Sequence, residues 1–181
     1  MKGLKSLGIG EVTGVKILGE GKPYVKTTAD STWSGISIPW MSIGYETKFT
    51  PLQILTFYNA VANGGKMVKP QFVKEIRDGS EVIFKNEVIV LKKSICSNKT
   101  IENAQFLLEK VVEEGTATNL KNLDFKIAGK TGTTQVGYGK SDSETKSNVK
   151  HQASFCGYFP ADNPEYSCIV VIHKPNKRIG Y

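Results

Sequence analysis

The residues whose types and spacing could do chemistry lie in one short segment, Ile-Ala-Gly-Lys-Thr-Gly-Thr-Thr-Gln, at residues 127–135. This segment places a lysine among threonine hydroxyls and glycines, and an ammonium group with neighbouring hydroxyl donors can hold an anion. Alternating apolar residues lead into the segment (Leu123, Phe125 and Ile127), and this pattern predicts a strand. Glycine weakens a strand, so Gly132 needs a reason, and a ligand backbone lying against the strand would supply one.

The same letters are compatible with other structures. A phosphate-binding loop requires a glycine at position 124, but the chain has Asp124 there, and its carboxylate would repel phosphate. A plain surface strand whose glycines mark a bulge stays open on the tripeptide Lys-Thr-Gly alone. Residues 7–14 come near a dinucleotide-binding fingerprint, but their third glycine is one place late and no strand precedes them, which excludes a nucleotide site.

Lys-Thr-Gly is also one of three sequence boxes of the penicillin-binding proteins and serine β-lactamases, and the segments around it fit that family. With this box, the chain resembles the class B penicillin-binding proteins, the transpeptidases of division and elongation. The matching segments follow in the family's order at residues 40–46, 50–53, 60–65, 111–117 and 152–160.

The resemblance implies an α+β fold, a partial β-lactamase/transpeptidase-like fold with an antiparallel sheet and packed helices. It implies that Lys130 sets the electrostatics for the terminal carboxylate of a substrate, that the Thr131 and Thr133 hydroxyls bind this carboxylate, and that Gly132 lets the peptide approach. It also implies that the Thr133 backbone N–H is one of two oxyanion donors. Lys130 and Thr133 are therefore the predicted catalytic residues.

The predicted substrate-binding segment continues through Thr134 and Gln135. A small residue often follows the second threonine in the family, so the role of Thr134 stays open. The family's nucleophile comes from a Ser-x-x-Lys box that precedes Lys-Thr-Gly, whereas residues 143–146 (Ser-Glu-Thr-Lys) follow it in a polar loop, with no apolar helix behind them. The second box, Ser-x-Asn, is absent. We therefore expect residues 1–181 to be the C-terminal portion of a transpeptidase domain, without its nucleophile and closing helix, and inactive alone.

The activity implied for the parent protein is peptidoglycan cross-linking by serine D,D-transpeptidation of D-Ala-D-Ala stem peptides, with penicillins acylating the same serine. No cofactor and no metal are implied. The implied partners are stem peptides, β-lactams and proteins of wall synthesis or division, at the outer face of the cytoplasmic membrane, with any anchor outside this chain. Two alternatives stay open: a non-catalytic peptide-binding or assembly module, and a β-lactamase-like hydrolase, which residues 40–46 and 152–160 disfavour.

Composition agrees with one soluble globular domain, because the 181 residues are 39% hydrophobic. The net charge of +7 comes from scattered lysines instead of a basic cluster, so no nucleic-acid partner is indicated. No apolar run reaches membrane-span length. None of the three cysteines forms a Cys-x-x-Cys pair, and Cys156 and Cys168 are expected to be small buried residues of strands.

Local signals predict the remaining elements. Thr50 and Pro51 predict the start of a helix that ends at Asn63. Asp78-Gly79 predicts a hairpin between residues 71–77 and 80–84. The other expectations are a helix capped by Thr100 and ended by Gly115, a loop at 136–150, and strands at 153–159 and 166–173 that continue the motif strand as an antiparallel sheet.

Overall fold

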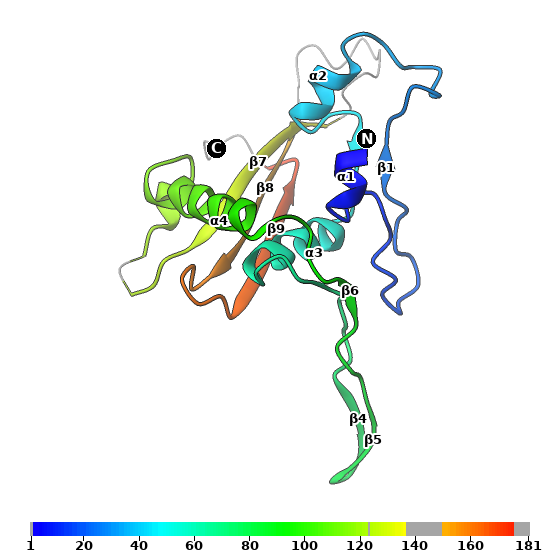
Figure 1. The fold of residues 1–181 in the computed structure, drawn as a ribbon, viewed down its shortest axis with the longest axis vertical. Coiled ribbons are helices and arrows are strands. Elements are labelled where there is room, and N and C mark those ends of the chain that lie inside the picture. Colours follow the sequence, from blue (N-terminus) through cyan, green and yellow to red (C-terminus); the bar gives the residue numbers. More distant parts are fainter. Residues whose placement is uncertain (1, 123, 137–149, 176–181) are drawn as a thin grey trace. The chain divides into compact units, whose positions relative to one another are not determined.

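The computed structural model describes residues 2–122, 124–136 and 150–175 (Figure 1). The chain forms two compact units, residues 1–103 and 104–181, and each is described by itself. Every strand pair is antiparallel, and helices accompany the sheets, so the predicted α+β class is confirmed.

Unit 1 contains short strand pairs joined by helices and loops. Its sheets pair β1 with β2, β3 with β6, and β4 with β5. Its elements are α1 (Lys2–Ser6), β1 (Tyr24–Val25), α2 (Ser37–Ser42), β2 (Thr47–Lys48), α3 (Pro51–Ala62), β3 (Met67–Val68), β4 (Glu75–Asp78), β5 (Glu81–Lys85), β6 (Val90–Lys92) and the first part of α4 (Asn98–Glu113).

Helix α3 begins and ends where the sequence predicts. The Thr50 side chain accepts from the Gln53 backbone N–H at 3.2 Å, and the Gln53 side chain accepts from the Thr50 N–H at 3.0 Å, which completes a capping box ahead of Pro51. At the other end, the Gly65 N–H donates to the Ala60 carbonyl at 2.7 Å, and Gly65 has φ +91°, a left-handed conformation that favours glycine.

The helical spacing of Leu52, Leu55, Tyr58 or Asn59, and Ala62 predicts that these residues form the buried face of α3, and the structure buries a different set. Thr56, Ala60 and Val61 are buried, whereas Leu52 and Leu55 are only half-buried. A polar residue can face the interior here because the Thr56 hydroxyl donates to the Leu52 carbonyl at 2.7 Å. A prediction from hydrophobic spacing alone was wrong about the buried face, because it takes no account of this local hydrogen bond.

A largely buried ion pair connects the two strands of the first sheet. Lys26 follows β1, and its ammonium lies 2.6 Å from Oε1 of Glu46, with exposed side-chain fractions of 7% and 21%. The Lys26 N–H also donates to the Glu46 carbonyl at 3.2 Å. Glu46 has φ +58°, which is uncommon for a residue other than glycine, so both contacts hold it in a strained turn.

Helix α4 starts three residues earlier than predicted. The Thr100 backbone N–H donates to the Ser97 hydroxyl at 3.2 Å, so Ser97 supplies the cap that the sequence had assigned to Thr100. The helix ends at Glu113, close before the predicted stop at Gly115.

Unit 2 holds the rest of α4, the 3₁₀ turn η1 (Thr118–Leu120), and the strands β7 (Ala128–Gln135), β8 (His151–Phe159) and β9 (Tyr166–His173). The strands form one sheet in the order β7-β8-β9, which confirms the three sequential antiparallel strands. Val112, Ala128, Cys156 and Tyr158 lie in its core.

Cysteine burial was predicted correctly at one position and wrongly at another. Cys156 on the central strand β8 is buried, but Cys168 on β9 is exposed. Cys168 pairs across the ladder with Gly157, which has no side chain to cover it. Within the described ranges, no helix is both long enough and apolar enough to cross a bilayer.

Candidate functional site

The predicted motif occupies β7, which lies at one edge of the sheet in unit 2. Within the described chain, β7 pairs only with β8, so its second edge is open to an added strand. Lys130 and Thr133 are exposed, while Thr131 and Gly132 are half-buried. The structure therefore presents the predicted residues along one accessible strand edge, which is where a peptide ligand could pair.

The ammonium of Lys130 turns back along its own strand. It donates to the Thr131 carbonyl at 2.9 Å and lies 3.3 Å from the Thr131 hydroxyl. Side chains alternate along a strand, so Lys130 and Thr131 start on opposite faces, and the long lysine side chain brings the two groups together. Among the described residues no carboxylate pairs with Lys130, which leaves its charge available to an anionic ligand.

Thr116 is a site residue to which the sequence assigned no role. Its hydroxyl lies 2.8 Å from the Thr131 hydroxyl, so the loop after α4 holds one of the predicted carboxylate-binding groups. The sequence places Thr116 next to the helix-ending Gly115, inside a segment that matches the family, but nothing local indicates a contact 15 residues away.

The glycines of β7 are explained by packing against β8. A Cβ at Gly132 would lie 2.8 Å from the Ser154 hydroxyl of the opposite strand. A Cβ at Gly129 would lie 2.4 Å from the Phe155 ring and 2.7 Å from the Cys156 carbonyl. The close approach that the sequence attributed to a ligand is therefore made, on one side at least, by the sheet itself.

The far end of the motif strand carries Thr134 and Gln135. Both are half-buried, and they pair across the ladder with Gln152 and His151. Their predicted role in substrate binding stays a prediction. His173 on β9 is exposed, with Nδ1 3.4 Å from Oε1 of Gln152.

Two ion pairs fix the chain that leads from α4 into β7. Lys126 lies 2.7 Å from Glu109, and Lys121 lies 2.7 Å from Glu113. The hydrogen bond with Glu109 raises the pKa of Lys126, and the hydrogen bond from Lys121 lowers the pKa of Glu113. These contacts hold the end of α4 against the chain that leads into β7.

Tyr158 lies in the core of unit 2. It is fully buried, its hydroxyl has no hydrogen-bond partner among the described residues, and burial raises its pKa to about 12. A neutral phenol at this position contributes packing and no acid or base at ordinary pH.

The serines of the Ser-x-x-Lys sequences lie outside the described residues. Residues 143–146, which carry the Ser-x-x-Lys sequence, lie outside them. A second Ser-x-x-Lys sequence at residues 147–150 follows directly, and its serine also lies outside the described residues. Within those residues, no group of three or more histidine, cysteine, aspartate or glutamate side chains is arranged to hold a metal.

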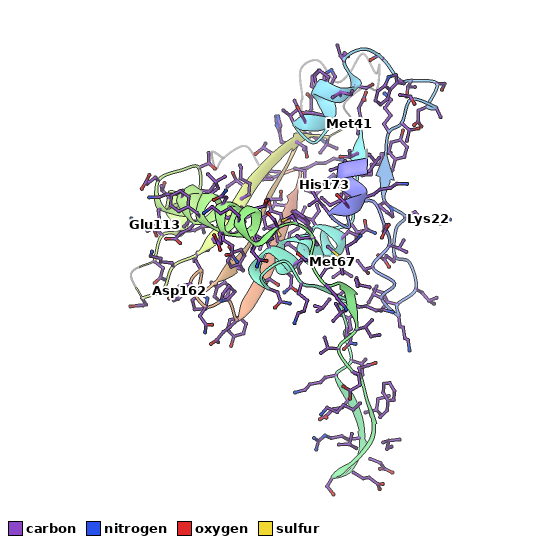
Figure 2. The ribbon with its side chains drawn as sticks, viewed as in Figure 1. Lys22, Met41, Met67, Glu113, Asp162 and His173 are labelled. Carbon is purple, nitrogen blue, oxygen red and sulfur yellow. The ribbon has the colours of Figure 1, made fainter. Side chains whose placement is uncertain are left out.

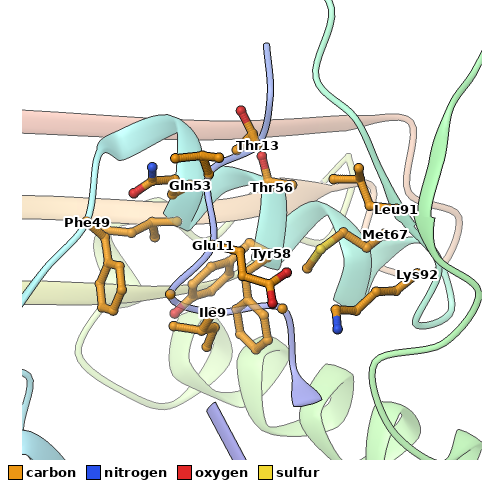
Figure 3. Close-up of a pocket in the computed structure, with 15 residues that line it drawn as sticks. Ile9, Glu11, Thr13, Phe49, Gln53, Thr56, Tyr58, Met67, Leu91 and Lys92 are labelled. Carbon is orange, nitrogen blue, oxygen red and sulfur yellow. The ribbon is translucent and has the colours of Figure 1, made fainter. Parts of the chain in front are cut away.

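Unit 1 has its own cavity of about 290 Å³ between α3 and residues 8–13 (Figure 3). Its lining is largely apolar, and Glu11 is one of its charged groups. Residues 8–13 belong to the glycine-rich stretch rejected as a nucleotide site, and a carboxylate there agrees with that rejection. A Cβ at Gly8 would lie 2.8 Å from the Met67 sulfur, so this glycine serves packing.

Comparison with known proteins gives the class. The family model of the penicillin-binding protein transpeptidase domain matches residues 1–181, so the chain belongs to that family. Penicillin-binding protein 2A of Bacillus subtilis is 33% identical over 172 residues, which are 91% of this chain and 24% of that protein. The peptidoglycan D,D-transpeptidase FtsI homolog of Mesostigma viride is 28% identical over 87% of this chain and 28% of that protein.

A solved structure agrees with the fold. Penicillin-binding protein 3 of Mycobacterium tuberculosis, complexed with ampicillin, matches with a TM-score of 0.76 and 26% identity, over 96% of this chain and 39% of that one. The resemblance to class B penicillin-binding proteins is thus confirmed. The chain spans about a quarter of the length of the curated relatives it matches.

Proposed function

We propose that this chain is the carboxylate-binding portion of a serine D,D-transpeptidase that cross-links peptidoglycan. The observation that carries this proposal is the exposed Lys130-Thr131-Gly132-Thr133 sequence on an open strand edge, with a lysine that no described carboxylate neutralises. A stem peptide ending in D-Ala-D-Ala would pair with β7, and its terminal carboxylate would lie against the Lys130 ammonium and the threonine hydroxyls.

The acyl transfer itself requires a nucleophile, which we place in the parent protein outside residues 1–181. The serine attacks the carbonyl of the penultimate D-alanine and releases the terminal D-alanine. The acyl group then passes from the serine to an amine of a neighbouring stem peptide. The Thr133 backbone N–H would stabilise the negative charge that develops on the carbonyl oxygen.

Binding of β-lactams follows from the same geometry, because a penicillin also presents a carboxylate beside a reactive carbonyl. The similar protein from Mycobacterium tuberculosis was solved with ampicillin, which supports this inference. The substrate lies outside the cytoplasmic membrane, so we place the parent at its outer face, held by a segment beyond this chain.

Intact mass after incubation with benzylpenicillin tests the proposal. We expect no adduct on the 181-residue chain and one stoichiometric adduct on the parent, at a serine before Met1. Lys130→Ala in the parent should slow formation of the adduct, whereas Lys150→Ala, at an exposed lysine directly before β8, should not.

Three results would count against the proposal. A parent that never forms the adduct would support a binding or assembly module, and rapid release of hydrolysed penicillin would support a β-lactamase-like hydrolase. An adduct on the short chain would place the nucleophile inside it. Peptide mapping would then have to test Ser143 and Ser147.

A further inference from the structure

The β4–β5 hairpin of unit 1 leaves an apolar groove open at its base. The groove has a volume of about 270 Å³. Its apolar lining, which we call the hairpin groove, consists of Val15, Ile17, Phe72, Val73, Ile76, Phe84 and Ile89. Phe72 is 65% exposed and Ile76 is 51% exposed. Large apolar side chains that are exposed together on one concave surface usually mark a binding site.

The groove is held open by hydrogen bonds across the base of the hairpin. The Asn86 side chain donates to the Val73 carbonyl at 2.7 Å, and the Gln71 side chain donates to the Glu87 carbonyl at 2.7 Å. The Lys69 N–H donates to the Ile89 carbonyl at 2.8 Å. A ligand therefore meets a preformed surface and loses little free energy in ordering it.

The strand register places two of the apolar side chains together. Ile76 on β4 is the cross-strand partner of Phe84 on β5, and both line the groove. The hairpin is a two-stranded ribbon that projects from the rest of unit 1 and carries side chains along its length (Figures 1 and 2).

The charged lining of the groove is entirely basic. Among the residues that the structure describes, Lys16 and Lys69 line it, and no aspartate or glutamate does. Neither lysine forms an ion pair with any described residue. Rim charges of one sign favour a partner of the opposite sign and repel others.

We propose that the hairpin groove docks a segment of another protein in which an apolar side chain stands next to aspartate or glutamate. The apolar side chain would enter between Phe72 and Phe84, and the carboxylates would meet Lys16 and Lys69. The concave shape favours a protein side chain over a lipid surface, which would instead require apolar groups at a convex tip. This surface takes no part in the proposed acyl transfer, so it adds a tethering function to the chain.

Selection of random peptides displayed on phage against the 181-residue chain tests this inference. We expect the enriched peptides to combine an aromatic or aliphatic residue with nearby acidic residues. Binding of the best peptide, synthesised and measured by calorimetry, should weaken at least about tenfold in Phe72→Ser and in Lys69→Glu. Phe72 lies outside the strands, so its replacement leaves the ladder intact.

Matched controls come from unit 1. Ile83→Ser removes an exposed apolar side chain of the hairpin that does not line the groove, and Lys22→Glu makes the same charge change as Lys69→Glu at an exposed position outside the groove. Both should bind the peptide as the unmodified chain does. Enrichment of neutral or basic peptides, absence of enrichment, or equal losses in the controls would overturn the proposal.

Other occupants give distinct results, and each would also overturn it. Self-association in analytical ultracentrifugation that Phe72→Ser abolishes would identify a second copy of the chain. Peptide binding by this chain but not by the whole parent would show that the parent's own residues fill the groove. Sedimentation with phosphatidylglycerol vesicles that depends on Phe72 would identify a membrane.

Discussion

The hydroxyls of Thr116 and Thr131 lie 2.8 Å apart, so the loop after α4 controls the orientation of a side chain in the motif strand. Thr131 also accepts from Lys130 at 3.3 Å. Because a hydroxyl has one proton to donate, its bond with Thr116 decides which lone pairs it offers to Lys130 and to a ligand.

Replacement of Thr116 should therefore slow acylation of the parent protein. We expect Thr116→Val to lower the second-order rate constant with benzylpenicillin about three- to tenfold, the worth of one hydrogen bond. Thr116→Ser keeps the hydroxyl and should restore the rate. Thr118→Val, at an exposed threonine in the next turn, is the control, and equal rates for the two valine variants would disprove a positioning role.

The glycines of the sheet should differ in how their substitution can be rescued. Gly132→Ala conflicts only with the Ser154 hydroxyl, at 2.8 Å, so it should cost about 1–2 kcal/mol in urea unfolding, and Ser154→Ala should recover most of the loss. Gly157→Ala places Cβ 2.3 Å from the Ala128 carbonyl oxygen. This backbone atom cannot be substituted away, so we expect a loss of about 3 kcal/mol or more that no single second substitution repairs.

A Gly132→Ala variant that Ser154→Ala fails to rescue would show that another contact constrains the strand at this position.

Cysteine reactivity should separate the thiols by burial. Burial, with a smaller contribution from Cys168, raises the pKa of Cys156 to about 12, so at about pH 8 the thiol is almost wholly protonated. Cys168 is exposed and should be alkylated by iodoacetamide at least about tenfold faster than Cys156. Peptide mapping by mass spectrometry measures both rates, and in guanidinium chloride the difference should vanish. Equal rates in the native chain would mean that unit 2 is not folded as described.

The Lys26–Glu46 ion pair should make stability depend on acid pH. The hydrogen bond from Lys26 lowers the pKa of Glu46 below its ordinary 4.5. A carboxyl group whose pKa is lower in the folded than in the unfolded chain stabilises the fold at pH values above its unfolded-state pKa. This stabilisation is lost as the pH falls through the folded-state pKa.

The melting temperature gives the readout for this pair. Glu46→Gln should lower it clearly above about pH 5, and the difference from the unmodified chain should shrink toward about pH 3. Glu81→Gln, at an exposed hairpin glutamate without an ion pair to a described residue, should change little at either pH. A constant difference for Glu46→Gln across this range would show that the ion pair is not responsible.

Local chemistry made several elements predictable from the sequence. The start of α3 follows from Thr50 and Pro51, whose effects reach only the next turn of the chain. The hairpin turn follows from Gly79, which has φ +57° at the tip of the ribbon. The strands β8 and β9 follow from two apolar runs and the turn residues between them. The alternating residues that predicted a strand at the motif precede β7, which begins at Ala128, and Leu123 lies outside the described residues.

The errors concern contacts between distant residues or competing local ones. The bond between Thr116 and Thr131 joins separate elements, and no pattern in either segment encodes it. The exposure of Cys168 depends on the position and pairing of β9 in the sheet, and the local sequence does not determine either. Ser97 and Thr100 are both good caps, and only the helix register chooses between them.

The packing of Phe155 over paired glycines limits how the proposed penicillin-binding strand can change in sequence. Gly129 is fixed by backbone atoms of β8 as well as by the ring, and Gly157 by backbone atoms of β7, so neither can acquire a side chain without breaking the ladder. Thr134 and Gln135 already carry side chains and are half-buried. Under the proposed role of β7 in binding penicillins, variants with altered drug preference should therefore arise at positions that already carry a side chain, such as Thr134 and Gln135, before they arise at Gly129 or Gly157.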